Sequence, residues 1–204
     1  NALYPIISYQ LLVAPKFSNS FISPTSESES VLNFGAVPKV LGQEIDLVDF
    51  TKAENWFPES EVDFTKEVEE TYKLSIPKLG IVDAVVSVGG DDLKKSLVQF
   101  PGTAVPGRFG NAIVFGHSVL PQFFNPKNYM TIFSTLPTLW PKDKIVIEYN
   151  QVKYNYIIEK MIEVLPSDSS ILAQRYDDSY LTLIPCVPPG TYFKRLVVKA
   201  RLIS

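Results

Sequence analysis

The sequence from residue 181 to residue 198 reads as a strand, a loop and a second strand, and it contains the only cysteine of the chain. A run rich in apolar and β-branched residues ends at Cys186. The Pro-Pro-Gly sequence that follows favours a turn, and a second apolar run begins after Arg195. Cys186 is therefore expected at the carboxyl end of a strand, where its side chain can leave the core and meet a ligand. Arg195 is expected beside it, at the start of the next strand.

Downstream of residue 70, short runs of β-type residues alternate with turn residues. The expected strands cover residues 72–76, 81–88, 112–116, 144–149, 153–164, 180–186 and 195–202. Asn150 predicts a tight hairpin between two of them. Residues 91–96 and 124–136 are expected to form short helical connections, the second with Asn125 as its cap and Pro126 at its first position. Many short strands with few helices predict a mainly β protein, either a barrel or a sandwich.

The composition excludes several kinds of site. A single cysteine allows no intrachain disulfide, and one histidine with one cysteine cannot supply the four ligands of a structural zinc site. We therefore expect no metal and no cofactor. No apolar run reaches 18 residues, so no transmembrane helix is expected within the chain. The positive excess of residues 71–204 is modest and lacks interleaved aromatic residues, which argues against nucleic acid as a partner.

His117, Cys186 and Arg195 have the chemistry needed for acyl transfer. A thiol attacks a carbonyl as its thiolate and needs a partner that later protonates a leaving amine. An imidazole suits both proton transfers near neutral pH, and a guanidinium can stabilise a tetrahedral oxyanion. Taken singly, each residue also has a structural interpretation: a small buried hydrophobe, a hydrogen-bonded core histidine and a surface ion-pair partner. Taken together, the three are sufficient for nucleophilic catalysis.

These residues lie in motifs that resemble those of the sortases, cysteine transpeptidases of the bacterial cell surface. The sequence Leu-Thr-Leu-x-x-Cys-x-Pro-x-Gly spans residues 181–190, an arginine follows nine residues after the cysteine, and Gly-His-Ser occupies residues 116–118. The resemblance includes Ile-Pro-Lys-Leu-Gly-Ile from residue 76, Phe-Pro-Gly-Thr-Ala-Val-Pro-Gly from residue 100 and Gly-Asn-Ala-Ile-Val from residue 110. It therefore covers about residues 72–203. It departs from the family at Pro185, where threonine is usual, and proline removes a backbone donor and fixes φ.

The resemblance implies an eight-stranded β-barrel with short helices, and it implies a role for each candidate residue. Cys186 would attack the peptide bond of a sorting signal similar to Leu-Pro-x-Thr-Gly and form an acyl-enzyme. His117 would protonate the departing amine and then accept a proton from the incoming one. Arg195 would position the substrate and stabilise the oxyanion. The partners implied are the sorting signal of a surface protein and an amine of peptidoglycan or of a pilin subunit.

The resemblance also implies an extracytoplasmic enzyme, held at the membrane by a helix that precedes Asn1 and is missing from this chain. Two other functions stay open. One is a cell-surface binding module that has lost turnover, which Pro185 favours. The other is a thiol peptidase that only hydrolyses. The loop at residues 166–179 corresponds to one wall of the sortase peptide groove; its Asp168, Asp177 and Asp178 could bind calcium, although a scattered acidic loop is usually only solvated.

The charge balance divides the chain near residue 70. Residues 1–70 contain 12 acidic and 4 basic residues, a net charge of −8, whereas residues 71–204 contain 10 acidic and 15 basic residues, a net charge of +5. We expect an acidic N-terminal extension at 1–70 and a catalytic barrel at 71–204. Trp56 and Phe57 lie in the acidic part. They either anchor a solvated extension to the surface or belong to a lid across a basic groove, as in some sortases, with surface charge pairs contributing little individually.

Overall fold

The computed structural model describes residues 3–17, 49–56 and 70–203. Helix α1 (Leu3–Leu12) is followed by the short 3₁₀ helices η1 (Ala14–Lys16) and η2 (Ala53–Trp56). The strands are β1 (Thr71–Ile76), β2 (Ile81–Val88), β3 (Leu97–Gln99), β4 (Gly110–Phe115), β5 (Lys144–Tyr149), β6 (Val152–Val164), β7 (Ser179–Ile184), β8 (Cys186–Val187) and β9 (Lys194–Ile203). Further 3₁₀ turns are η3 (Pro77–Leu79), η4 (Pro121–Phe123), η5 (Leu136–Thr138) and η6 (Ser169–Leu172).

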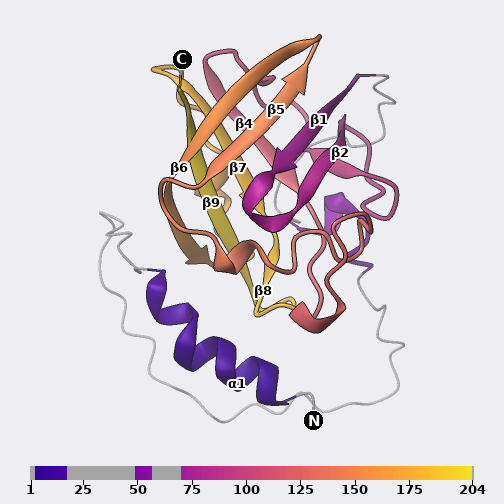
Figure 1. The fold of residues 1–204 in the computed structure, drawn as a ribbon, viewed down its shortest axis with the longest axis vertical. Helices are drawn as coiled ribbons and strands as arrows, with labels where there is room; N and C mark the ends of the chain where they lie inside the picture. Colours follow the sequence, from indigo (N-terminus) through magenta and orange to yellow (C-terminus); the bar gives the residue numbers. More distant parts are fainter. Residues whose placement is uncertain (1–2, 18–48, 57–69, 204) are drawn as a thin grey trace.

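Eight of the described strands form a closed, mixed barrel (Figure 1). They follow the order β6, β5, β1, β2, β3, β4, β7 and β9, and the antiparallel pairing of β6 with β9 closes the ring. The pairs β2–β3 and β4–β7 are parallel, while the other neighbours in the ring are antiparallel. The short β8 pairs only with β9. The eight-stranded, mainly β barrel expected from the sequence is confirmed.

The alternation of side chains along each strand builds the core inside this barrel. In β1, Tyr72, Leu74 and Ile76 are buried while Thr71 and Lys73 face solvent, the period of two expected for a strand with one face on the core. Strands β4 and β7 are buried on both faces. A second layer must therefore cover their outer side, and it does so at the end of the barrel where the candidate catalytic residues lie.

This outer layer is a separate apolar cluster. From the strands it contains Val98, Ile113, Phe115, Ile184 and Cys186, and from other segments it contains Ala53, Trp56, Leu93 and Phe100. Ala53 and Trp56 belong to η2, which precedes the barrel in the chain and lies over β4 and β7. We call residues 49–56 the covering segment, because they close the outer face at this point.

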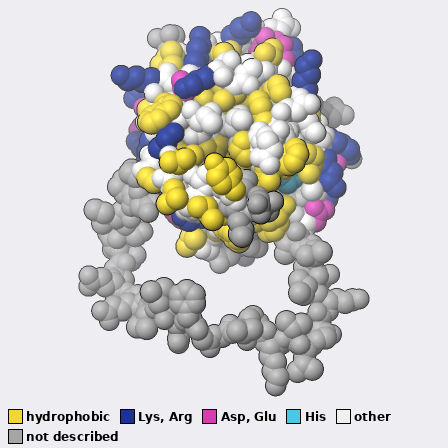
Figure 2. Space-filling view, turned by 60° about the horizontal axis from the view of Figure 1, so that its bottom comes forward, with side chains coloured by type: hydrophobic (Ala, Val, Ile, Leu, Met, Phe, Trp, Pro, Cys, Tyr) yellow, Lys and Arg dark blue, Asp and Glu magenta, His cyan; other side chains and the backbone are white. Residues whose placement is uncertain are grey.

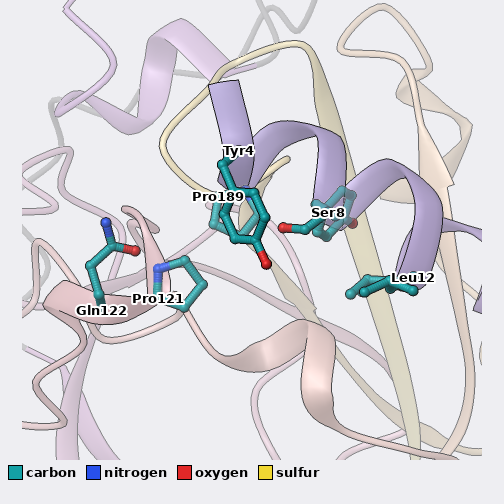
Figure 3. A pocket seen from close by; sticks show the side chains of 8 residues that line it. Tyr4, Ser8, Leu12, Pro121, Gln122 and Pro189 are labelled. Carbon is teal, nitrogen blue, oxygen red and sulfur yellow. The ribbon is translucent and has the colours of Figure 1, made fainter. Parts of the chain in front are cut away.

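Helix α1 lies beside the lower end of the barrel in Figure 1, and its contact with the barrel is partly polar. Tyr9 is buried, and its hydroxyl donates to Glu163 Oε1 at 2.6 Å. Glu163 Oε2 accepts from Lys194 Nζ at 2.9 Å, so one buried carboxylate joins the helix to both β6 and β9. A cavity of about 270 Å³ separates α1 from η4 and from the loop after β8, with Tyr4, Ser8 and Leu12 on one side and Pro121 and Pro189 on the other (Figure 3).

Two strands, β2 and β5, have the bounds expected from the sequence, and the hairpin at Asn150 is present, with positive φ at both Asn150 and Gln151. The expected helices at 91–96 and 124–136 are wrong. The first is a turn bridged to the covering segment by hydrogen bonds such as Leu93 N to Thr51 O at 3.0 Å. In the second, the side chains of Asn125 and Asn128 accept from backbone amides two residues later, which competes with helix formation.

Candidate active site

The pairing of β4 with β7 brings His117 and Cys186 to the same end of the barrel. These strands are parallel neighbours in register, with Phe115 opposite Ile184. His117 and Cys186 each follow two residues after this last pair. Ser118 joins the two chain segments, because its hydroxyl donates to the carbonyl oxygen of Cys186 at 2.6 Å. Gly116 permits this exit from β4, since a Cβ there would lie 2.5 Å from the ring of Phe133 and 2.6 Å from Leu97.

Arg195 is directly opposite Cys186 in the β8–β9 pair. Its guanidinium is almost fully buried, with 1% of the residue exposed. It donates from Nη1 to the carbonyls of Tyr192 at 3.1 Å and Lys194 at 3.3 Å, and from Nη2 to the carbonyl of Trp56 at 3.3 Å. The structure thus brings the three candidates for catalysis to one end of β4, β7 and β9.

Trp56 of the covering segment fills the space over these residues and is fully buried. Its ring packs edge-on to His117 at 6.0 Å between centroids, and the guanidinium carbon of Arg195 lies 5.1 Å from the ring. The indole Nε1 donates to the carbonyl of Phe50 at 2.9 Å, which satisfies its polar atom. The other aromatic residue expected to form a lid, Phe57, lies outside the described residues.

Residues on both sides of Trp56 hold the covering segment to the barrel. Phe50 stacks on Tyr192 at 4.1 Å between ring centroids, in the loop that leads to Arg195. Lys52 Nζ forms an ion pair with Asp91 at 2.7 Å, and Ala53 N donates to the carbonyl of Asp91 at 2.9 Å. Sequence reasoning missed these contacts at Phe50, Lys52 and Asp91, because each residue alone is typical of an ordinary surface.

Burial favours the neutral forms of His117 and Cys186 in this arrangement. Burial lowers the pKa of His117 from 6.5 to about 4, with Asp49 opposing the shift and Lys94 adding to it. Burial raises the pKa of Cys186 to about 11, although the nearby charge of Arg195 favours the thiolate. Burial also lowers the pKa of Arg195. Near neutral pH the covered site therefore holds a thiol and an uncharged imidazole.

Two buried polar atoms at the site have no hydrogen-bond partner among the described residues: His117 Nε2 and Arg195 Nε. Buried donors and acceptors are rarely left unpaired, because each costs about 1–3 kcal/mol. Both atoms belong to candidate catalytic groups, so the site has hydrogen-bonding capacity that a substrate could use. Across the described parts of the chain, no three His, Cys, Asp or Glu residues are arranged to hold a metal ion.

Within residues 3–17, 49–56 and 70–203, no helix has the length and apolar content needed to span a membrane. The carboxylates of the β6–β7 loop have local partners. Asp168 accepts from Ser170, Asp177 pairs with Arg175, and Asp178 pairs with Arg201.

The comparisons with known proteins agree with the fold. The family model described as the Sortase domain matches residues 74–203. The solved structure of a Clostridium perfringens sortase D5 transpeptidase is 26% identical, with a TM-score of 0.58, over 68% of this chain and 83% of that one. Sortase A from Corynebacterium diphtheriae is 27% identical, with a TM-score of 0.58, over 68% of this chain and 62% of that one.

A pilus-related sortase C of Group B Streptococcus is 26% identical, with a TM-score of 0.58, over 68% of this chain and 70% of that one. No curated protein sequence matches the chain. The family model covers well over half of the chain, and the similar structures share its barrel. The chain therefore belongs to the sortase family of cysteine transpeptidases.

Proposed function

We propose that this protein is a transpeptidase in which Cys186 is the nucleophile, His117 the acid and base, and Arg195 the oxyanion ligand. The observation that supports this most strongly is the convergence of the three side chains at one end of β4, β7 and β9, with unpaired polar atoms on two of them. Each unpaired buried polar atom costs about 1–3 kcal/mol of folding free energy, and binding of a substrate that pairs with it would recover this cost.

In this mechanism Cys186 passes its proton to His117 and attacks the carbonyl carbon of the scissile peptide bond. Arg195 stabilises the oxyanion of the tetrahedral intermediate with its N–H groups. The imidazolium of His117 then protonates the leaving amine, which departs and leaves a thioester on Cys186. An incoming amine gives a proton to His117 and attacks the thioester, which forms the new amide and regenerates the thiol.

The substrate proposed is a sorting signal similar to Leu-Pro-x-Thr-Gly, and the acceptor an amine of the cell wall or of a pilin subunit. Support comes from Ile113, Phe115 and Ile184, which are fully buried in the cluster with Trp56 and Cys186 and would offer an apolar surface to a peptide when the covering segment moves away. The protein would act outside the cytoplasm, attached to the membrane in its full-length form. Sorting reactions on surface proteins require that location.

We further propose that the covering segment is a lid. Trp56 occupies the space above His117 and Arg195, and a substrate carbonyl must reach the same space. Opening would also let water and substrate reach Cys186 and would reverse the burial that raises its pKa. The lid would thus control both access and reactivity.

Pro185 does not argue for a binding module in this fold. It lies between β7 and β8, where the chain leaves its pairing with β4, and its carbonyl accepts from Leu196 N at 3.0 Å. Position 185 continues the register of the β7–β9 pair, so proline removes only the one bond that its own N–H would return to Leu196, and the pairing resumes at Cys186 opposite Arg195. The unusual residue therefore fits the local backbone around an active nucleophile.

Intact-mass spectrometry tests the reaction. The full chain, the Trp56→Ala variant and the Cys186→Ala variant would be incubated with a Leu-Pro-x-Thr-Gly peptide library, with and without triglycine. We expect a Cys186 adduct that resolves into amine-linked product, faster for Trp56→Ala and absent for Cys186→Ala. If water hydrolyses the Cys186 adduct and no amine-linked product forms with any amine tried, the protein is a hydrolase. If neither the full chain nor Trp56→Ala forms an adduct, the proposal that the protein is an enzyme is contradicted.

A further inference from the structure

A buried carboxylate connects helix α1 to the catalytic end of the barrel. The side chain of Glu163 in β6 is only 3% exposed. Its Oε1 accepts from the hydroxyl of Tyr9 at 2.6 Å, and its Oε2 accepts from Lys194 Nζ at 2.9 Å. Lys194 immediately precedes Arg195 in β9. The mechanism proposed above uses none of Tyr9, Glu163 and Lys194.

The backbone ladder that holds Arg195 beside Cys186 has only two pairs. Strand β8 pairs its two residues with Arg195 and Lys194. On the other side of β9, the pairing with β6 ends where Arg195 is opposite Val164. Among the described strands, the backbone of β9 at Lys194 is therefore paired with β8 alone. The side-chain bond from Lys194 to Glu163 extends the attachment of β9 to β6 by one residue beyond this end.

Lys194 and Arg195 point to opposite faces of this ladder, as successive residues of a strand do. Cys186, opposite Arg195, belongs to the outer cluster. Val187, opposite Lys194, belongs to the inner core. Glu163 therefore binds Lys194 on the inner face, where α1 packs, and leaves the outer face to Arg195 and its substrate.

The carbonyl of Lys194 also holds the guanidinium in place. Arg195 Nη1 donates to this carbonyl at 3.3 Å and to the carbonyl of Tyr192 at 3.1 Å. A displacement of Lys194 would move one acceptor of the guanidinium and the backbone nitrogen of Arg195 together. The bond between Lys194 and Glu163 restrains both.

Stability alone does not account for a carboxylate at this position. Burial of the Glu163 side chain costs hydration free energy, and attraction to a cation often returns only part of it, so apolar residues of similar volume are frequently as stable. A hydrogen-bonded ion pair does, however, hold two long side chains in one geometry. In this protein that geometry fixes the residue next to the proposed oxyanion ligand.

We infer that Glu163 is a positioning residue, which fixes Lys194 and thereby orients Arg195 at the active site. Tyr9 holds Glu163 in turn, so helix α1 contributes to this arrangement. The inference rests on the proposed transpeptidase function and adds no new step to it. Helix α1 would thus support turnover although it precedes residues 74–203, the part that matches the Sortase domain.

The test measures kcat and KM for a sorting peptide and triglycine in variants of the full-length Trp56→Ala chain, in which the lid does not limit the rate. In Glu163→Gln/Lys194→Met both charges are lost, but the amide oxygen can still accept from Tyr9. We expect kcat to fall about tenfold with KM changed by less than about twofold, because a misplacement of about 1 Å can cost up to about 100-fold. Lys194→Arg keeps a cation for Glu163 and should retain at least about half of the parent's kcat.

Asp143→Asn/Lys78→Met is the matched control. Lys78 Nζ lies 2.7 Å from Asp143 Oδ2, and the same carboxylate accepts from Trp140 N at 2.7 Å. The control therefore removes a similar ion pair between η3 and the residue before β5, elements that carry none of the candidate catalytic residues. It should keep the kcat of its parent.

Unchanged kcat in Glu163→Gln/Lys194→Met would overturn the inference while leaving the transpeptidase intact. An equal fall in the control or in Lys194→Arg would also overturn it, since the loss would then not depend on this ion pair. Absence of turnover in the Trp56→Ala parent would overturn the transpeptidase and this inference together.

Tyr9→Phe gives a second test if urea denaturation shows that Glu163→Gln/Lys194→Met is unfolded. This substitution keeps the buried ring and removes only the hydroxyl that donates to Glu163. We expect a lower kcat with KM maintained, and unchanged kcat would overturn the inference.

Discussion

The inner core of the barrel and the outer cluster at its catalytic end are both apolar and buried, but they treat polar groups differently. Inside the barrel, the hydroxyl of Tyr72 donates to Gln99 Oε1 at 2.8 Å, and that of Tyr156 accepts from Gly107 N at 2.9 Å. In the outer cluster, His117 Nε2 and Arg195 Nε are buried without partners among the described residues. Of the three buried polar atoms without a partner among the described residues, two therefore belong to candidate catalytic residues, and the third, Thr135 Oγ1, is next to Leu136 of the inner core.

The hydrophobic surface of the molecule fits this division. Figure 2 turns the lower end of the molecule towards the reader and shows hydrophobic side chains gathered across it. The exposed Phe123 and Phe193 belong to the loops after His117 and Cys186. The barrel wall, by contrast, alternates core residues with polar ones, as in β1. Apolar surface is thus present at the end where the candidate catalytic residues lie, and Val82, Val85 and Val152 are also exposed on the barrel wall.

The largest expected difference between the two regions comes from paired substitutions. Leu183→Ala, inside the barrel, should lower the free energy of unfolding by about 2–5 kcal/mol because it leaves a cavity. Cys186→Ala should abolish turnover and reduce stability much less, since it removes only one sulfur atom. Urea denaturation and a transpeptidation assay measure the two effects. A Cys186→Ala protein with substantial turnover would remove the nucleophile from the account.

Arg195→Ala should reduce kcat/KM by about 10²–10³-fold. This corresponds to a loss of about 2.7–4 kcal/mol of transition-state stabilisation, the range for a lost oxyanion donor. Arg195→Lys keeps the positive charge but loses the planar donor geometry, so it should recover only part of this loss. Steady-state kinetics of both variants in the Trp56→Ala background avoid the influence of the lid. Near-normal activity of Arg195→Ala would mean that other hydrogen-bond donors stabilise the oxyanion.

Acid should destabilise the covered site through His117. Its folded pKa of about 4 lies below its ordinary value of 6.5, so the unfolded or opened chain binds a proton more readily. Burial of the uncharged His117 side chain therefore favours the folded state fully above pH 6.5, and this contribution to stability is lost as the pH falls towards 4. Between pH 7 and pH 5, we expect the free energy of unfolding of wild type to fall by about 2 kcal/mol more than that of His117→Gln. An equal fall in the free energy of unfolding of both proteins would contradict the burial of an uncharged His117.

The ion pair between Lys52 and Asp91 should have the smallest effect. Their side chains are 40% and 31% exposed, and exposed pairs contribute less than about 1 kcal/mol. Lys52→Ala should therefore raise the rate of Cys186 alkylation by less than about fivefold. A much larger increase would mean that charge, and not the packing of Trp56, holds the covering segment in place.

Much of the barrel could be predicted because its signals are local. The alternation in β1 and the turn at Asn150 each specify one conformation over a few residues. The short β3 was missed because Leu97–Gln99 is too brief to show a period. Helix α1 was missed because Leu3–Leu12 has no charged residue to mark a polar face. The division of the chain near residue 70 stays a prediction.

The candidate catalytic residues could be named from the sequence because they lie in recognisable motifs. Their protonation could not, because burial dominates the pKa shift of His117, and Trp56, whose ring packs against His117, is 61 residues away in the chain. The contacts of Phe50 with Tyr192, and of Lys52 with Asp91, are likewise set by tertiary packing. A pattern along the chain carries no signal for such pairs.

The most direct test of this account is the rate at which a small thiol reagent modifies Cys186 in the full chain and in Trp56→Ala at neutral pH. Cys186 is the only cysteine, so intact mass reports on it alone. If the covering segment closes the active site, Trp56→Ala should react at least tenfold faster, while Trp140→Ala, at a half-exposed tryptophan outside the site, should match wild type. Equal rates for wild type and Trp56→Ala would contradict closure of the active site by this segment.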